Sequence, residues 1–348
     1  MTTEDRKKTD DLYLSRCFAL AKLGGRKTLS NPNVGCVIVY KDRIIGEGFH
    51  RSFGAPHAEV DAIKSVDEKD FPLLKHAAMY VSLEPCSHYG KTPPCAELIV
   101  HHQIPEVVIG AIDPNPKVAG KGVQYLRNHG VTVTVHNSPI AENIIGKFRK
   151  NLQQKPYVIL KWAQSKDRFI GRKDEQIWLS HPQTSILTHS WRSQVDGIAV
   201  GKNTWLTDKP QLTDRYFQNH LQPIKIIFDR NNTVAPTLMD YNKEEKIIVV
   251  NEVSMKEMDQ VRFLKCENTN DLYQVLKSLY QQGIHSILVE GGAQLLQHFI
   301  EQNAWDEARI IQTNVKIETG IKAPNISGKI HEVWHVEHDK IVQIFPTI

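Results

Sequence analysis

Residues 84–95 read EPCSHYGKTPPC, and residues 56–59, further upstream, read PHAE. A pair of thiols held among prolines, here Cys86 and Cys95, could form a disulfide, a buried apolar pair or half of a metal site. The chain contains five cysteines, a small and odd number that disfavours a secreted disulfide framework. In a reducing compartment, we expect such a pair to hold metal or to take part in chemistry.

The residues around this pair predict a zinc site. His57 can supply an imidazole and Cys86 and Cys95 two thiolates, which leaves a tetrahedral zinc ion with one position open for water, as in catalytic sites. Glu59 follows His57 by two positions at the expected start of a helix, where it can reach that water without being a ligand. H-x-E followed by P-C and a second Cys is the signature of zinc nucleobase deaminases, although eight residues separate the cysteines here. We predict one zinc ion per chain and Glu59 as the catalytic residue.

Length and composition indicate a protein of two domains. The chain has 348 residues, of which 41% are hydrophobic and 24% charged, and half of it is enough to bury a core. No apolar run is long enough to span a bilayer, and the N-terminal residues lack the apolar core of a signal peptide, so we expect a cytoplasmic protein without a membrane partner. The formal charge of +4 is spread along the chain, which favours small anionic substrates over nucleic acid.

The first half alternates predicted helices and strands, as a layered α/β domain does. The predicted elements are a helix at 10–24, strands at 34–40 and 44–50, a helix from about His57, a strand at 77–86, a helix at 93–103 and a strand at 106–113. Polar residues 146–156 then lack a comparable apolar face and end in Pro156. We therefore predict a first domain at 1–146, a linker at 147–155 and a second domain at 156–348.

The second half forms another predicted α/β unit, without an internal repeat. Its predicted strands are 157–165, 196–201, 224–229, 246–250, 286–292 and 308–313, and its predicted helices are 181–194, 272–283 and 293–303. Gly291 and Gly292 lie between a strand and a helix, an arrangement that can bring backbone N–H groups to a phosphate, but two glycines can equally form a simple tight turn. There is no G-x-G-x-x-G, so a Rossmann domain is not supported.

Five motifs of the first half give a family resemblance. The runs SNPNVGCVIV, GEGFH, PHAEVDA, LEPCSHYGKTPPC and DPNPKVAGKG closely resemble the deaminase domain of the bifunctional riboflavin-biosynthesis deaminase-reductase family. The resemblance implies a cytidine-deaminase-like α/β/α domain in which the insertion between the cysteines lines the substrate site. It also implies substrate contacts from Asn31, His50, His88 and Lys91, with Lys91 suited to the ribose phosphate.

The second half resembles the reductase domain of the same family, in LKWAQSKD, WLSHPQ, WRSQVDGIAVGKNTWLTDKPQLTDR and VEGGAQL. The resemblance implies a dihydrofolate-reductase-like fold that uses NADPH. The implied cofactor-binding residues are Ala163, Gln164, Trp178, Thr204, Asp208, Gly292, Ala293, Gln294 and Leu295. The implied substrate-binding residues are Gln176, Arg192, Leu212, Arg215 and Glu290, of which the two arginines suit a phosphate.

Two positions depart from the pattern of this family. The family usually has S-x-D-G where this chain has Ser165-Lys166-Asp167-Arg168, and Gln176 stands where a Ser is frequent. Losing the glycine removes an easy left-handed backbone conformation and adds a charged side chain near the expected cofactor path.

The resemblance implies a two-step enzyme of riboflavin biosynthesis that acts on phosphorylated pyrimidines. It deaminates 2,5-diamino-6-(5-phosphoribosylamino)pyrimidin-4(3H)-one and then reduces the ribosyl group with NADPH, giving 5-amino-6-(5-phosphoribitylamino)uracil. It also suggests a homo-oligomer joined through the reductase domains. Three alternatives stay open: a deaminase whose reductase is weakened or inactive, a cytidine or tRNA-adenosine deaminase with an unrelated second domain, and a non-catalytic RNA-binding or regulatory protein with structural zinc.

Overall fold

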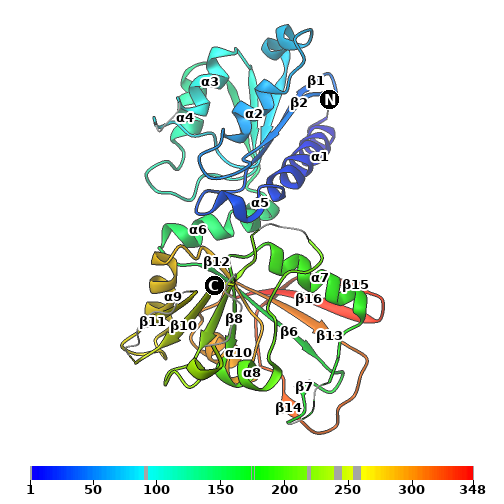
Figure 1. Ribbon diagram of the computed structural model, residues 1–348. Helices are drawn as coiled ribbons and strands as arrows, with labels where there is room; N and C mark the ends of the chain where they lie inside the picture. The colour runs from blue at the N-terminus through cyan, green and yellow to red at the C-terminus, as the bar shows by residue number, and fades with distance from the viewer. Residues whose placement is uncertain are drawn as a thin grey trace. The chain divides into compact units, whose positions relative to one another are not determined.

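The computed structural model describes residues 2–89, 93–173, 175, 177–217, 221–238, 245–253 and 260–347. The described chain divides into two compact units between Gln153 and Gln154 (Figure 1). This division lies inside the stretch 147–155, and the limits of the linker stay a prediction. Each unit has a sheet and a core of its own, and each is described by itself.

The first unit has a five-stranded sheet of order β2-β1-β3-β4-β5. Its strands are β1 (Gly35–Tyr40), β2 (Arg43–Phe49), β3 (Ala78–Val81), β4 (Glu106–Ile109) and β5 (Thr132–Val135). The pairs β2-β1 and β1-β3 are antiparallel, with Gly35 opposite Phe49 in the expected hairpin, and the remaining pairs are parallel. Among the described residues of this unit, six α-helices and two 3₁₀ helices accompany the sheet: α1 (Thr3–Lys22), α2 (Ala58–Lys64), α3 (Cys95–His101), α4 (Lys121–Asn128), α5 (Pro139–Ile144), α6 (Gly146–Leu152), η1 (Gly25–Thr28) and η2 (Phe71–His76).

Two hydrophobic clusters cover the two faces of this sheet and give the unit three layers. On one face, Leu14 of α1 packs with Val37 and Val108. On the other face, Ala62 of α2 and Ile99 of α3 pack with the strand residues whose side chains point away from α1, such as Ile38. Helices α2 and α3 therefore lie on the same face of the sheet. Two of the expected zinc ligands, His57 and Cys95, lie at the starts of these helices.

Helix α1 begins at Thr3, earlier than the predicted residue 10. The Thr2 side chain accepts a hydrogen bond from the Asp5 amide, and the Asp5 carboxylate accepts one from the Thr2 amide. This capping box stabilises a polar first turn. Apolar periodicity could not detect that turn because its residues, such as Glu4 and Asp5, are polar.

The second unit has a nine-stranded sheet of order β11-β10-β9-β8-β12-β6-β13-β16-β15. Its strands are β6 (Tyr157–Gln164), β8 (Gly197–Gly201), β9 (Ile224–Phe228), β10 (Ile247–Asn251), β11 (Val261–Lys265), β12 (Ser286–Val289), β13 (Glu307–Gln312), β15 (Lys329–Val336) and β16 (Asp339–Phe345), beside a separate pair, β7 (Phe169–Gly171) and β14 (Ile321–Lys322). The strands from β11 to β13 are parallel, and β16 and β15 complete the sheet in antiparallel orientation. Its helices are α7 (Pro182–Ser193), α8 (Lys202–Asp208), α9 (Leu272–Gln281), α10 (Ala293–Glu301) and η3 (Ala235–Leu238).

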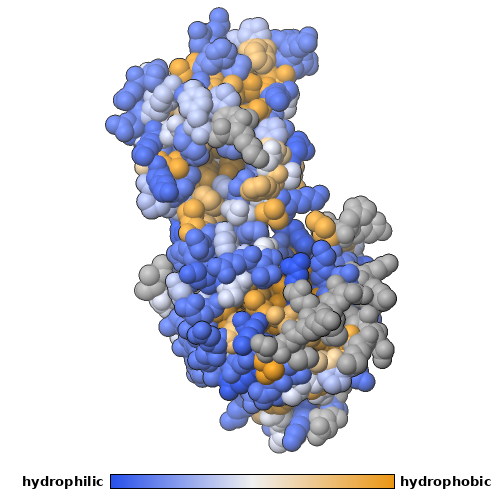
Figure 2. Space-filling model, turned by 60° about the vertical axis from the view of Figure 1, so that its left-hand side comes forward, coloured by the Kyte–Doolittle hydropathy of each residue, from blue (hydrophilic) through white to orange (hydrophobic). Residues whose placement is uncertain are grey.

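The two faces of the large sheet have separate apolar cores. Helices α9 and α10 supply Leu276 and Phe299 to one core, which also contains Trp162 of β6. Trp191 of α7 and Trp205 of α8 belong to the other core. The view in Figure 2 shows hydrophilic and hydrophobic side chains interleaved on the surface of the described residues.

Candidate active sites

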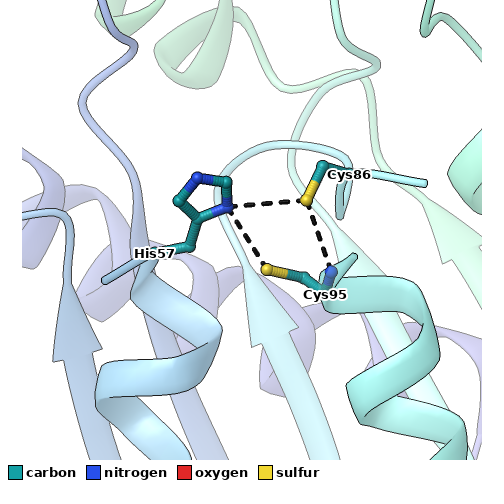
Figure 3. A group of neighbouring side chains, drawn as sticks. All are labelled: His57, Cys86 and Cys95. Carbon is teal, nitrogen blue, oxygen red and sulfur yellow. Dashed lines mark hydrogen bonds between the residues drawn. The ribbon is translucent and has the colours of Figure 1, made fainter. Parts of the chain in front are cut away.

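Three metal-ligating side chains of the first unit meet at the starts of two helices. His57 immediately precedes α2, Cys95 is the first residue of α3, and Cys86 lies in the loop after β3. The Nδ1 atom of His57 lies 3.5 Å from the Cys86 sulfur and 3.3 Å from the Cys95 sulfur (Figure 3). The Cys95 amide donates a hydrogen bond of 3.3 Å to the Cys86 sulfur.

A zinc ion fits the geometry of this cluster. Bonds of about 2.0 Å to nitrogen and 2.3 Å to sulfur place the N and S ligands of a tetrahedral site about 3.5 Å apart, as found between His57 and the two sulfurs. Both cysteines are free thiols. Within the described part of the chain, the metal-binding group consists of these three residues, so a fourth coordination position remains for water.

The local electrostatics favour the thiolate form of Cys86. Its pKa is lowered to about 4 by the hydrogen bond with Cys95 and then by that with His57, despite burial. The hydrogen bond with Cys86 in turn raises the pKa of His57 to about 9. Thiolate is the form that binds zinc, so the sulfur is prepared for the metal.

Glu59 lies beside the cluster in the first turn of α2 and is 3% exposed. Burial, followed by the charge of Cys86, raises the pKa of Glu59 to about 7. A carboxyl group of this kind can both accept and release a proton near neutral pH.

A cavity of about 220 Å³ opens beside the cluster. The expected residues Asn31, His50, His57, Glu59, Cys86 and His88 all line it. Asn31 Nδ2 and His50 Nε2 lie 3.2 Å apart, and His50 Nδ1 lies 3.0 Å from the Pro56 carbonyl oxygen, so the imidazole is fixed on both sides. Lys91 lies outside the described residues and keeps its role as a prediction.

The cavity also contains residues that the sequence did not single out. Asp113, Asn115, Val118 and Phe148 line it, as does Glu84. The first three belong to DPNPKVAGKG, so this motif could have been recognised as a lining segment. No motif indicated Phe148.

Glu84 is a buried carboxylate that holds the DPNPKVAGKG loop. Its Oε2 accepts hydrogen bonds from the amides of Asp113 at 3.1 Å and Gly120 at 2.9 Å. Its Oε1 accepts from the amides of Gly122 at 2.8 Å and Val123 at 3.2 Å. A Cβ on Gly122 would lie 2.1 Å from the Pro85 carbonyl oxygen, so only glycine allows this approach. The Glu84 side chain thus joins the loop that carries Cys86 to the DPNPKVAGKG loop.

The second unit contains a cavity of about 700 Å³ between α8 and the start of α10. Six of the expected cofactor-binding residues line it: Thr204, Asp208, Gly292, Ala293, Gln294 and Leu295. Gly292 has a φ of 72°, which favours glycine. A Cβ on Gly291 would lie 2.9 Å from the Thr204 methyl group, so the turn depends on both glycines.

Basic residues not predicted from the sequence complete this cavity. They are Arg172, Lys173, Lys202 and His298. Cationic side chains with backbone amides at a glycine turn are the groups that bind a phosphorylated dinucleotide.

The other expected cofactor-binding residues lie outside this cavity. Ala163 and Gln164 end β6, and the buried Gln164 side chain lines a different cavity. Trp178 is 79% exposed. For these three residues, cofactor contact remains a prediction.

A buried charge cluster marks the expected reductase substrate site. Arg192 donates to both carboxylate oxygens of Glu290, at 2.6 and 2.7 Å, and to the Thr213 carbonyl oxygen at 3.2 Å. Lys161, which the sequence did not single out, places its Nζ 3.9 Å from Glu290. Burial raises the pKa of Glu290, but the charges of Arg192 and Lys161 outweigh it and bring the pKa to about 2. The carboxylate is therefore ionised at neutral pH.

The remaining substrate positions have different environments. Leu212 is buried with a φ of 50°, and Arg215 is exposed and donates a 2.9 Å hydrogen bond to Gln211. Gln176 lies outside the described residues. Arg168, the noted departure, has a φ of 65°, so this position does adopt the left-handed conformation that glycine favours.

Comparisons with known proteins find relatives of both units. Residues 7–111 match the model of the cytidine and deoxycytidylate deaminase zinc-binding region, and residues 156–315 match that of the RibD C-terminal domain. The chain is 34% identical to the riboflavin biosynthesis protein RibD of Aquifex aeolicus, with 85% of each chain covered. It is also 34% identical to RibD of Bacillus amyloliquefaciens, over 97% of this chain and 95% of that one.

Solved structures extend this similarity over both units. A diaminohydroxyphosphoribosylaminopyrimidine deaminase/5-amino-6-(5-phosphoribosylamino)uracil reductase from Thermotoga maritima superposes with a TM-score of 0.86 at 30% identity, covering 98% of this chain and 99% of that one. RibD of Acinetobacter baumannii gives a TM-score of 0.82 at 32% identity, again covering 98% and 99%.

Fold and site together define a zinc-dependent deaminase joined to a dihydrofolate-reductase-like reductase. The chain belongs to the RibD family, the bifunctional deaminase-reductases of riboflavin biosynthesis. The predictions of fold class, enzyme class, zinc and NADPH are thereby confirmed. Among the described helices, none has the length and apolarity needed to cross a membrane.

Proposed function

We propose that the first unit deaminates 2,5-diamino-6-(5-phosphoribosylamino)pyrimidin-4(3H)-one and that the second reduces the product to 5-amino-6-(5-phosphoribitylamino)uracil. The observation that carries this proposal is the His57–Cys86–Cys95 cluster with the buried Glu59 beside it. The activity of the Thermotoga maritima relative supports the same pair of reactions.

For the deamination, we assign His57, Cys86 and Cys95 to the metal and Glu59 to proton transfer. Zinc, when bound, lowers the pKa of a water molecule and so supplies the nucleophile. Glu59 accepts the proton of that water and returns protons to the ring and to the departing amine. Because the carboxyl group is buried beside Cys95, little bulk water competes for those protons.

Substrate orientation in the deaminase falls to the other lining residues of the cavity. Asn31 and His50 are in contact and present polar groups to the pyrimidine edge. His88 and Lys91, from the loop between the cysteines, contact the phosphoribosyl part, where Lys91 supplies a point charge for the phosphate. The length of this loop is what distinguishes the site from that of a free nucleobase deaminase.

For the reduction, we assign the glycine turn before α10, with Thr204 and Asp208, to the cofactor. NADPH, when bound, would supply a hydride for the ribosyl C1′. The C1′–O4′ bond of the ribose breaks and O4′ takes up a proton from water, which leaves the open ribityl chain. The Gly292 turn and the cations of the same cavity hold its phosphates. Ala163, Gln164 and Trp178 are assigned to the nicotinamide end by the family resemblance alone.

We propose different roles for the two substrate arginines. Glu290 and the Thr213 carbonyl oxygen already accept the hydrogen bonds of Arg192, so Arg192 orients the Glu290 carboxylate. Arg215 is exposed and can swing to the substrate phosphate. Leu212 packs below the substrate, and Gln176 remains assigned to it by resemblance.

The structure bears differently on the three alternatives. A closed structural zinc site would need a fourth protein ligand, and the described residues supply three. A cytidine or tRNA-adenosine deaminase would not explain the second unit, which matches the RibD C-terminal domain. A weakened reductase is less well supported because the Arg192–Glu290 pair and the cofactor cavity are both in place.

One incubation tests the proposal against all three. The protein is given the diamino pyrimidine phosphate with and without NADPH, and ammonia and NADPH are followed together. We expect ammonia in both cases and NADPH oxidation only after deamination. Ammonia release without NADPH oxidation would indicate a deaminase with an inactive reductase. The absence of both signals would refute the proposal.

We also propose a homo-oligomer joined through the reductase units, acting in the cytoplasm on small phosphorylated pyrimidines and not on nucleic acid. The modest net charge of +4 supports the last point, since polynucleotide binding usually depends on a strongly basic surface. Sedimentation of the full chain tests the oligomer.

A further inference from the structure

The reductase unit contains another cavity, of about 650 Å³, on the face of β6 opposite to Lys161. We call it the β6–β15 pocket, after the strands that bound it. Strand ends of β6, β13, β16 and β15 form its floor, and residues 165–168, 324–326 and 337–338 contribute to its walls. Its described lining shares no residue with the cofactor cavity.

The strand register places a polar row at one end of this floor. The row consists of Gln164, Gln312, Lys340 and His335, each directly opposite the next across four neighbouring strands. The preceding pair on the same face, Trp162 and Ile310, is apolar. The pocket therefore has an apolar floor beside a polar, cationic edge, as small-molecule sites do.

Positive charge predominates around this edge. Lys166, Arg168 and Lys340 carry cationic side chains, whereas Glu337 is the one carboxylate among the lining residues that the structure describes. Asp167 lies in the same turn, where its carboxylate accepts hydrogen bonds from the Ser165 hydroxyl and the Glu318 amide. When Asp167 is counted, three cations still outnumber two carboxylates.

Thr313 lines the pocket and carries a buried hydroxyl group. The residue is 3% exposed, and its Oγ1 has no hydrogen-bond partner among the described residues. Buried hydroxyls are nearly always hydrogen-bonded, so this polar atom is unusual, but the oxygen itself is shielded from the cavity.

The backbone conformation of Arg168 also supports a binding role for its side chain. Its φ of 65° is a conformation that disfavours side chains, yet the position carries a long cation that lines the pocket. Local strain of this kind often accompanies a functional side chain. Because the Arg168 amide and carbonyl groups already bond to Ser165 and Ala323, the turn itself does not require an arginine side chain.

We propose that the β6–β15 pocket binds a small phosphorylated organic molecule at a site distinct from the deaminase cavity and from the cavity at the glycine turn. Arg168, Lys166 and Lys340 pair with the phosphate oxygens. The organic part lies over Trp162 and Ile310. Gln164, which the family resemblance assigns to the nicotinamide end, also lines this pocket, so binding is tested with NADPH already bound.

The test uses the full-length, zinc-loaded protein saturated with NADPH and carrying Lys91→Ala with Arg215→Ala, which weaken the two proposed substrate phosphate sites. Inorganic phosphate and ribose 5-phosphate are titrated by calorimetry. We expect about one site per chain, with ribose 5-phosphate binding more tightly than phosphate. Adding Arg168→Gly should weaken binding by ~10-fold or more, as for a lost charge-assisted hydrogen bond.

Two further variants keep this test decisive. Lys340→Gln removes a cation without touching the turn and should also weaken binding, whereas Lys265→Ala removes an exposed cation elsewhere in the unit and should not. Arg168→Gly should leave the melting temperature unchanged or higher, because glycine suits the left-handed turn. No binding in the background of Lys91→Ala with Arg215→Ala, or binding unaffected by both Arg168→Gly and Lys340→Gln, would overturn the proposal.

Discussion

The two sites of this chain are built in contrasting ways. The proposed deaminase centre draws its metal ligands and its acid-base group from two short motifs, at 57–59 and 86–95, and their polar atoms are in direct contact. The proposed reductase site takes residues from β6, α7, α8, the segment after β12 and the start of α10, which are far apart in sequence. A compact site fails completely when one atom is changed, whereas a dispersed site should lose binding in separable parts.

The largest effect should come from Cys95→Ser. Serine does not replace a thiolate in a site with three protein ligands, so the variant should lose its zinc and its deamination should fall to background. Metal analysis and ammonia release check this. Full zinc occupancy would remove Cys95 from the ligand set. Cys266→Ser, in the second unit, is the matched control and should keep both zinc and deamination.

Glu59→Gln should separate chemistry from metal binding within the same cluster. The amide keeps the shape but cannot accept or return a proton, so deamination should fall by at least ~10²–10⁴-fold. Zinc content should stay, and the variant should still oxidise NADPH when the deaminated substrate is supplied. Near wild-type deamination would reduce Glu59 to a buried structural carboxyl; loss of zinc would show that it holds the ligands.

Arg215→Ala tests whether the dispersed site loses its functions separately. Removing a charge-assisted contact with the phosphate should raise the KM for the phosphorylated substrate by ~10–100-fold. NADPH affinity should change little, because Arg215 does not line the cofactor cavity. Equal losses of substrate and cofactor affinity would show that the reductase site is as tightly coupled as the deaminase centre. Lys322→Ala, at an exposed position of β14, is the control.

The smallest effect is expected for Glu84→Gln, which acts on the deaminase through the DPNPKVAGKG loop. In the wild type, four backbone N–H groups donate to the Glu84 carboxylate oxygens. In the variant, the glutamine NH₂ group is a donor facing two of these donors, so the loop should shift. We expect deamination to fall by about 10-fold, mainly through KM, with zinc retained. A loss confined to thermal stability, without a change in KM, would limit Glu84 to a structural role. Reduction of the deaminated substrate should not change.

The compact site was the more predictable one. A metal site needs particular side chains at close spacing, and His57, Glu59, Cys86 and Cys95 lie within two motifs, so the sequence alone located them. Asn31, His50 and His88 followed from the family resemblance and do line one cavity. Glu84 was overlooked because its role depends on amides far along the chain, such as those of Gly120 and Gly122.

The dispersed site could be predicted only in outline. The glycine turn was visible in the sequence, but Lys161 reads as one lysine in a buried strand until β12 places Glu290 beside it. The C-terminal hairpin β15–β16 was also missed, because the side chains of β15 are mostly exposed and give no clear apolar alternation. Its pairing with β13 creates the polar row of the β6–β15 pocket. Helix α8 is short, and the part of α1 before residue 10 is polar. Neither segment has an apolar repeat long enough to predict a helix.

The most direct test of the central claim, two chemistries in two independent sites, is removal of zinc followed by both assays on the same sample. After chelation we expect ammonia release from the diamino substrate to disappear, while NADPH oxidation with the deaminated substrate continues at its original rate. About one equivalent of zinc per chain should restore the ammonia signal. If chelation abolished both activities together, or left deamination intact, the assignment of zinc chemistry to the first unit and of an independent reductase to the second would be contradicted.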